Sequence, residues 1–172
     1  MLFVNKIKNF VNSKKILNKE EFQKKINKGM RYEISKNKLK HDIEQINYLL
    51  KRKLISKKFK NEIKNYKLVY NALPKKAEAT NIFTLSKEFT YKLGPTFNNL
   101  VYYQPPDIIE GKIINENKKI TLKNSGKKFR YIVLDNFLDL KALDKLFSFC
   151  LTNSIWNEFD YKNGYIGSFI EN

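Results

Sequence analysis

The stretch that decides the fold runs from Phe129 to Ile170. It begins Phe129-Arg-Tyr-Ile-Val-Leu134 and Asp135-Asn-Phe-Leu138, and continues as Asp139-Leu-Lys-Ala-Leu-Asp-Lys-Leu-Phe-Ser-Phe-Cys-Leu151. It then reads Ser154-Ile-Trp-Asn-Glu-Phe-Asp-Tyr161, Lys162-Asn-Gly164 and Tyr165-Ile-Gly-Ser-Phe-Ile170. A short apolar run, a helical repeat and an alternation across a turn follow one another, and this order predicts a strand, a helix and a β-hairpin.

Each of these elements has a local physical reason. The run Tyr131–Leu134 is apolar and bounded by charge, which is typical of a strand covered on both faces. Asp139 stands where a helix N-cap is needed, because its carboxylate can accept from free amides of the first turn. The dipeptide Asn163-Gly164 tolerates positive φ at both positions of a hairpin turn. The apolar residues of the helix are expected on one buried face: Leu140, Leu143, Leu146, Phe147 and Cys150.

These residues also carry a resemblance to a known family. The run "YIVLDNFLDLKALDKLFSFCLTNSIWNEFDYKNGYIGSFIEN" resembles the opening of the catalytic domain in prolyl 4-hydroxylase-like Fe(II)/2-oxoglutarate dioxygenases. Upstream, "KLKHDIEQINYLLKRKLI" and "YKLGPTFNNLVYYQPP" resemble the helical leader of some bacterial members. The resemblance covers roughly residues 36–172 and rests on structural motifs, since none of the matching residues is a metal or cosubstrate ligand.

The resemblance implies an α+β fold. A helical hairpin region is followed by the first strand, helix and β-hairpin of a double-stranded β-helix (jelly-roll) oxygenase domain, which is truncated here. We accordingly expect a basic amphipathic leader over 1–17, a helical region over 18–95, an irregular connector over 96–128 and the start of the β domain over 129–172. The family chemistry implies Fe(II) and 2-oxoglutarate in a full-length protein, with a peptide or a small molecule as substrate. By the same resemblance, three aromatic residues around the hairpin would line a substrate groove: Trp156, Tyr161 and Tyr165.

The iron-binding residues of such enzymes are missing from this chain. A facial triad needs two histidines and one carboxylate, and the chain has one histidine, His41. We therefore predict no catalytic, cofactor-binding or metal-binding residue here. The expectation is the front part of a longer dioxygenase, inactive alone and, with its hairpin edges unpaired, poorly ordered near its end.

The charge of the chain is large and uneven. Of 172 residues, 34 are Lys or Arg and 17 are Asp or Glu, giving a net charge of +17. Residues 1–70 carry +14 of this and the remaining 102 residues carry +3. The arginines are only Arg31, Arg52 and Arg130, and arginine is the better ligand for bidentate phosphate or guanine contacts. Composition therefore argues against specific nucleic-acid recognition.

The rest of the composition is typical of a domain with a packed core and no membrane-spanning segment. Hydrophobic residues make up 42% of the chain, with 13 Phe and 10 Tyr. Cys150 is the only cysteine, which gives no reason to place the protein in an oxidising compartment. No apolar run is long enough for a transmembrane segment. We expect a cytoplasmic location.

Two well-defined helices are predicted in the first half. Leu39, Ile43 and Ile46 begin the first apolar stripe, with Lys40, Asp42, Glu44 and Lys51 expected on the opposite, polar face. The second stripe runs from Phe59 to Leu73, with Ser56 as its candidate cap and Pro74 after its end. A short connection predicts that they form a hairpin. A shorter helix is expected over 20–28, capped by Asn18 or Ser13 and ended near Gly29, and one or two turns over Ser86–Leu93.

Two other functions stay open at this point. One is a lysine-rich module that binds nucleic acid by phosphate neutralisation, with exposed tyrosines for stacking. The other is a helical module whose C-terminal β segment pairs with a partner's sheet.

Overall fold

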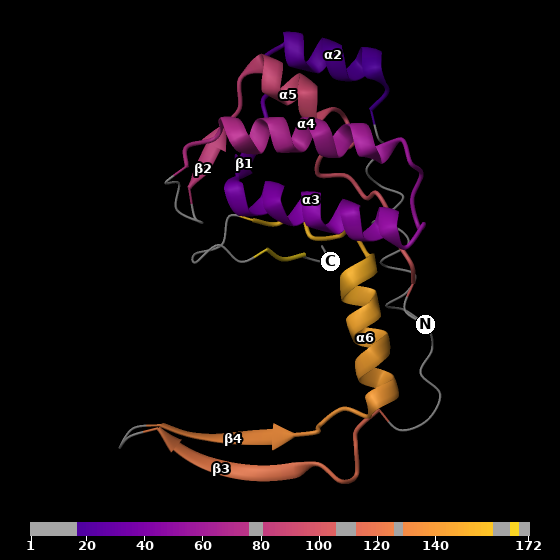
Figure 1. The fold of residues 1–172 in the computed structure, drawn as a ribbon. Helices are drawn as coiled ribbons and strands as arrows, with labels where there is room; N and C mark the ends of the chain where they lie inside the picture. The colour runs from indigo at the N-terminus through magenta and orange to yellow at the C-terminus, as the bar shows by residue number, and fades with distance from the viewer. Residues whose placement is uncertain (1–16, 76–80, 106–112, 126–128, 160–165, 169–172) are drawn as a thin grey trace. The chain divides into compact units, whose positions relative to one another are not determined.

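The computed structural model describes residues 17–75, 81–105, 113–125, 129–159 and 166–168. Within them the fold is α+β, with five helices and two small antiparallel sheets of two strands each (Figure 1). Residues up to Tyr103 and from Thr152 onward form one compact unit, called unit 1, and Gln104–Leu151 form unit 2. The elements are α2 (Lys19–Asn27), β1 (Glu33–Ser35), α3 (Lys36–Lys51), α4 (Phe59–Ala72), β2 (Ile82–Thr84), α5 (Lys87–Leu93), β3 (Lys119–Ser125), β4 (Phe129–Asp135) and α6 (Leu140–Thr152).

The helices of unit 1 pack as a stack. Helix α3 contacts α4, α4 contacts α5, and α5 contacts α2 (Figure 1). The predicted hairpin of two helices is confirmed as α3 and α4. The shorter helix is confirmed as α2, where Asn18 and Glu21 form a reciprocal capping box. Helix α5 is confirmed too, and the Ser86 side chain accepts from the Phe89 amide at 3.2 Å.

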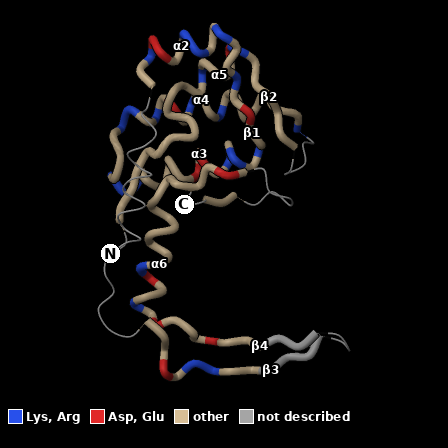
Figure 2. The backbone as a smooth tube through the Cα atoms, turned by 180° about the vertical axis from the view of Figure 1, so that it is seen from behind, with Lys and Arg blue, Asp and Glu red and all other residues tan. Residues whose placement is uncertain are grey.

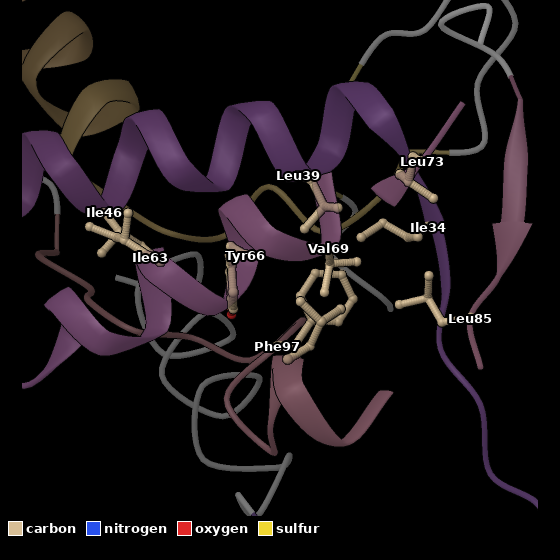
Figure 3. Close-up of a cluster of buried hydrophobic side chains, with 10 residues drawn as sticks. Ile34, Leu39, Ile46, Ile63, Tyr66, Val69, Leu73, Leu85 and Phe97 are labelled. Atoms are coloured by element: carbon tan, nitrogen blue, oxygen red, sulfur yellow. The ribbon is translucent and has the colours of Figure 1, made fainter. Parts of the chain in front are cut away.

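The core of unit 1 lies where α3, α4 and the chain after α5 meet. Tyr66 of α4 packs edge-on against Phe97, with ring centroids 5.8 Å apart, and Tyr32 packs against Phe97 at 4.9 Å. Edge-to-face aromatic pairs add about 0.5–1.5 kcal/mol beyond the area that they bury. Figure 3 shows the buried cluster, whose members are Ile34, Leu39, Ile46, Ile63, Tyr66, Val69, Leu73, Leu85, Leu93 and Phe97.

A small sheet closes one side of this core, and no sequence signal predicted it. Strands β1 and β2 pair antiparallel, with Ile34 opposite Phe83. Each strand has only three residues, too few for a period to be read. The pairing joins segments almost fifty residues apart, so it depends on the packing of the helices between them.

Unit 2 contains a β-ribbon. Strands β3 and β4 pair antiparallel from Lys119↔Asp135 to Ser125↔Phe129. After β4 the pairing register shifts at Asn136, whose φ is +55°. Beyond this shift, a bridge between Ile114 and Leu138 continues the antiparallel pairing. The predicted strand at Tyr131–Leu134 is confirmed as β4. Its partner β3 lies in the stretch for which we expected no regular element.

Helix α6 and the segment after it follow the predicted order. The Asp139 carboxylate accepts from the Lys141 amide at 2.9 Å, which confirms the predicted N-cap. Glu158 and Gly167 exchange two backbone hydrogen bonds of 3.0 and 2.8 Å. This bridge fits the predicted hairpin, whose Asn163-Gly164 turn lies outside the described residues.

The predicted burial of unit 2 is wrong. Ile132 and Leu134 of β4 are 62% and 40% exposed, although we expected a strand covered on both faces. The apolar face of α6 is also largely exposed, from 45% at Leu143 to 75% at Leu140. The local patterns were read correctly, but neither face finds a covering element among the described residues.

Two smaller predictions about unit 1 are also wrong. Ser56 does not cap α4: its side chain lies 3.5 Å from the Lys58 amide, and the N-cap position is Lys58. Residues 96–103, at the start of the expected connector, form turns and bends. Asp42, expected on the polar face of α3, is buried. The expected leader over 1–17 lies outside the described residues except for Leu17.

Basic positions are prominent on α2 and in the turn between α3 and α4 (Figure 2). Lys40 and Glu44, both expected on the polar face of α3, form an ion pair of 4.0 Å on its exposed side. No helix in the described ranges has the length and apolar character that crossing a membrane requires.

The difference in burial between the units predicts a difference in local stability. We expect amides of β3 and β4 to exchange with solvent well before those of α3 and α4, because an isolated two-stranded ribbon is marginally stable in water. Native-state hydrogen exchange followed by mass spectrometry measures this. Equal protection of the ribbon and of the helical hairpin would contradict the prediction.

Candidate functional site

The most unusual feature of unit 1 is a buried ion pair on α3. The Lys38 ammonium lies 2.5 and 2.6 Å from the two carboxylate oxygens of Asp42, one helical turn further along. The side chains are 2% and 12% exposed. Lysine and aspartate are almost never buried unless they are paired, and each has lost most of its hydration here.

Aromatic and polar neighbours complete the surroundings of the pair. The Lys38 ammonium lies 5.6 Å from the centroid of the Phe97 ring, within the range of a cation–π contact. The Nδ1 atom of His41 lies 3.2 Å from Asp42 Oδ1, which is the oxygen 2.5 Å from the Lys38 ammonium. His41, the one histidine of the sequence, is partly exposed.

The ion pair borders a small polar cavity of about 20 Å³. This volume holds about one water molecule. The walls come from α3, from Tyr66 of α4, from the turn after α5 and from the segment after α6. The lining residues are Lys38, Asp42, Gln45, Ile46, Tyr66, Thr96, Asn98, Asn99, Val101, Ser154, Trp156 and Asn157.

The segment after α6 is held on this cavity by hydrogen bonds. The Ser154 hydroxyl oxygen accepts from the amides of Val101 and Tyr102, both at 2.8 Å. Gln45 of α3 donates its side-chain amide to the Asn153 carbonyl at 2.6 Å. Asn153 is fully buried. Two stretches of chain that are fifty residues apart are therefore joined beside the ion pair.

The turn after α5 supplies an unusual backbone and an unpaired oxygen. Asn98 has a φ of +57°, in the left-handed region that asparagine tolerates better than most residues. Its Oδ1 atom is buried and has no hydrogen-bond partner within the described part of the chain. An orphaned buried oxygen beside a water-sized polar cavity fits a site for one bound water molecule.

Burial and charge shift two ionisable groups near the cavity. Burial, followed by the charges of Asp42 and Glu62, raises the pKa of Tyr66 well above its usual 10, against a hydrogen bond with Thr96 that lowers it. Burial also raises the pKa of Glu62, while its hydrogen bond from Thr96 (3.1 Å) and the charge of Lys58 oppose that shift.

The predicted groove aromatics are only partly located. Trp156 lines the polar cavity together with Lys38 and Ser154. Tyr161 and Tyr165 lie outside the described residues, so their role in a substrate groove stays a prediction. The residues that sequence reasoning missed are Lys38 and Asp42. The sequence did contain a signal for the burial of Asp42. Positions 39, 42, 46 and 49 lie on one face of a helix, and the other three positions hold apolar residues.

The arrangement does not form a recognisable catalytic site. The cavity has an ion pair, amides and one serine, and Ser154 Oγ is engaged by two backbone amides, not by a base. No group of three His, Cys, Asp or Glu side chains in the described ranges is placed to hold a metal ion. The geometry fits a structural polar centre with one small solvent site.

A second hollow lies in unit 2 and has a volume of about 430 Å³. It is lined by Asn115, Asn136, Phe137, Leu138, Leu140 and Leu143. This lining consists of two amide and four apolar side chains, and it contains no acid, base or nucleophile. It is an open hollow beside the apolar face of α6.

Comparisons with known proteins add no family assignment. No family model, no curated protein and no solved structure matches this chain.

Removing one partner of the buried pair should destabilise the fold. We expect Asp42→Ala to lower the free energy of unfolding by about 3–5 kcal/mol, because Lys38 is left buried and uncompensated. The double variant Lys38→Met/Asp42→Leu should recover most of the loss, since neither charge remains. Urea denaturation measures both values.

The exposed pair on the same helix is the matched control. Lys40→Ala/Glu44→Ala should change the free energy of unfolding by less than about 1 kcal/mol, because solvent screens this pair. A loss as small as this in Asp42→Ala would contradict the prediction, because it would show that an uncompensated Lys38 ammonium costs little free energy at this position.

The raised pKa of Tyr66 predicts sensitivity to alkali. Below pH 10 the Tyr66 phenol is neutral in both the folded and the unfolded protein. Above pH 10 the phenol of the unfolded chain deprotonates first, so the free energy of unfolding falls as the pH rises toward the pKa of Tyr66 in the folded protein. We expect Tyr66→Phe to lose less stability than the wild type between neutral pH and about pH 11, in thermal melts followed by circular dichroism. Tyr91→Phe, at a 55% exposed position, should follow the wild-type profile. Matching profiles for all three proteins would contradict the assignment.

Proposed function

We propose that residues 129–168 are the opening elements of a prolyl 4-hydroxylase-like Fe(II)/2-oxoglutarate dioxygenase domain of jelly-roll type. The observation that carries the proposal is the order of elements: β4 is followed by the Asp139-capped helix α6 and then by the Glu158–Gly167 bridge. The sequence resemblance implies the same order. The helices of unit 1 take the place of the helical leader.

The exposed surface of unit 2 supports this proposal. Fourteen large hydrophobic side chains are exposed in the described part of the chain, and eleven of them lie between Ile113 and Leu151. Three of them, Ile120, Ile132 and Leu134, stand on one face of the ribbon, because opposite residues of an antiparallel pair share a face. Large apolar patches on a folded protein mark surfaces that another element covers. In a jelly roll, a second sheet covers such a face.

The residues of this chain do not fit the iron site of such an enzyme. Two histidine ligands cannot come from His41 alone, and His41 lies on α3 beside Asp42 and Lys38. We therefore derive no catalytic step. On this proposal the chain supplies a framework, and another part of a longer polypeptide binds Fe(II), 2-oxoglutarate and a peptide or small-molecule substrate. Trp156, Tyr161 and Tyr165 remain proposed groove residues, and the proposed location is the cytoplasm.

The natural transcript tests the proposal directly. We expect the reading frame to continue past the codon for Asn172 into a His-x-Asp or His-x-Glu and a distal histidine, because the triad needs both. Sequencing the transcript and measuring the mass of the expressed product decide this. A stop codon after Asn172 in both would end the dioxygenase proposal. The 2-oxoglutarate turnover of a longer product would then be measured with and without its first histidine.

A further inference from the structure

Helix α4 presents a line of lysines on the side that faces away from the core. Its inward face carries Ile63, Tyr66 and Val69, all buried. Residues three and four apart share a helix face, so Lys60, Lys64 and Lys67 lie together on the opposite face of α4. These three and Lys57, from the turn that leads into α4, are here called the α4 lysine row, and all four are exposed.

No acidic side chain balances the α4 lysine row. The only acid on α4 is Glu62, which accepts a hydrogen bond from Thr96 on the inward side. None of the four lysines takes part in an ion pair with a residue in the described ranges.

The other helices of unit 1 differ in this respect. Lys40 of α3 pairs with Glu44, and Lys92 of α5 pairs with Glu88. On α2, Glu20 and Glu21 lie four residues before Lys24 and Lys25, respectively, and so share a helix face with them, whereas Glu62 of α4 lies on the inward side. A lysine-rich composition accounts for many lysines on every helix, but not for one outward face without acids.

The row has the length and shape of a linear contact. Seven residues separate Lys60 from Lys67, which spans about 10 Å along α4, and Lys57 lies in the turn that precedes the helix. Exposed Arg52 and Lys53 also lie in the turn before α4. Four exposed ammonium groups without an acidic partner produce a positive strip, and linear polyanions are the partners that such a strip attracts.

We propose that the α4 lysine row binds the phosphate backbone of nucleic acid without reading its sequence. Lysine contacts phosphates as a point charge, and such contacts supply essentially all of non-specific affinity. The shortage of arginine argues against base recognition and leaves this backbone mode intact. The inference does not depend on the proposed dioxygenase relationship.

The structure favours nucleic acid over a membrane surface for this helix. A helix that lies on a membrane inserts its apolar face into the lipid boundary. The apolar face of α4 is already packed in the core of unit 1, and the one large apolar residue of α4 that is exposed is Leu68, at 44%. A surface that offers four ammonium groups and a single exposed large apolar residue suits a hydrated polyphosphate chain better than a lipid boundary.

Salt-dependent binding tests the proposal with the full chain. Fluorescence anisotropy of a short fluorescein-labelled DNA duplex of mixed sequence gives the affinity at several salt concentrations. Four phosphate contacts predict a slope of log Kobs against log[salt] of about −3.6. The variant Lys57→Gln/Lys60→Gln/Lys64→Gln/Lys67→Gln should bind at least about tenfold more weakly, with a slope nearer zero by about 3–4.

The matched control removes the same charge elsewhere. Lys19→Gln/Lys24→Gln/Lys25→Gln/Lys28→Gln alters four exposed lysines on and next to α2, and should change the affinity less than about threefold. Circular dichroism melts confirm that both variants fold. Equal losses in the two variants would overturn the proposal, because net charge alone would then explain binding.

Two further outcomes would also overturn it. One is no detectable binding of the wild type to the duplex at low salt. The other is binding to vesicles of phosphatidylserine and phosphatidylcholine that depends on the α4 lysine row while the duplex does not bind. A second duplex of unrelated sequence should bind within about twofold of the first, because phosphate contacts carry no sequence information.

Discussion

The buried ion pair between Lys38 and Asp42 is the constraint on which the arrangement of unit 1 depends. Taking two charges out of water costs several kcal/mol for each ion, and the cost is offset only where geometry and neighbouring groups are favourable. Those neighbours come from distant parts of the chain: the Phe97 ring beneath the ammonium, Tyr66 from α4, and a segment after α6 that Gln45 and Ser154 hold in place. The pair therefore specifies how α3, the turn after α5 and the segment after α6 meet, rather than adding a large amount of stability.

Unit 2 has no comparable centre. Its strands and its helix form for local reasons: a paired ladder, an Asp139 cap and a helical apolar repeat. Among its described side chains, the one buried hydrophobic residue is Ala142. Hydrogen bonds satisfy the backbone of the ribbon. The apolar faces of the ribbon and of α6 remain in water, so burial of apolar surface contributes little to the stability of these elements. That imbalance is the physical ground on which we propose that further sheet covers this unit.

The parts of the fold that could be predicted from the sequence are those whose cause is local. Helices α3, α4 and α6 each repeat apolar residues along one face, and Asn18, Ser86 and Asp139 mark helix starts by chemistry that acts within one turn. Strands β1 and β2 were missed because their pairing exists only once the helices have packed. Strand β3 was missed because its apolar residues were read as part of a connector. The burial of Lys38 and Asp42 was missed for a different reason: charged residues were assigned to the outside by type, although position 42 lies on the inward stripe.

The effect of a lysine's charge also depends on its position in the fold. A residue count treats every lysine alike, and by that count residues 1–70 are simply basic. The structure distinguishes at least three physical situations among the lysines of unit 1. Lys38 is buried and neutralised within the core. Lys40 and Lys92 face solvent beside a carboxylate. The α4 lysine row faces solvent with no carboxylate on its side of the helix. Of these three situations, the third leaves a field that extends beyond the protein surface, within a Debye length of about 8 Å at physiological salt. A partner that reaches this surface meets the uncompensated row and not the average charge, so the row, rather than the net charge of +17, is the feature that can select where a polyanion binds.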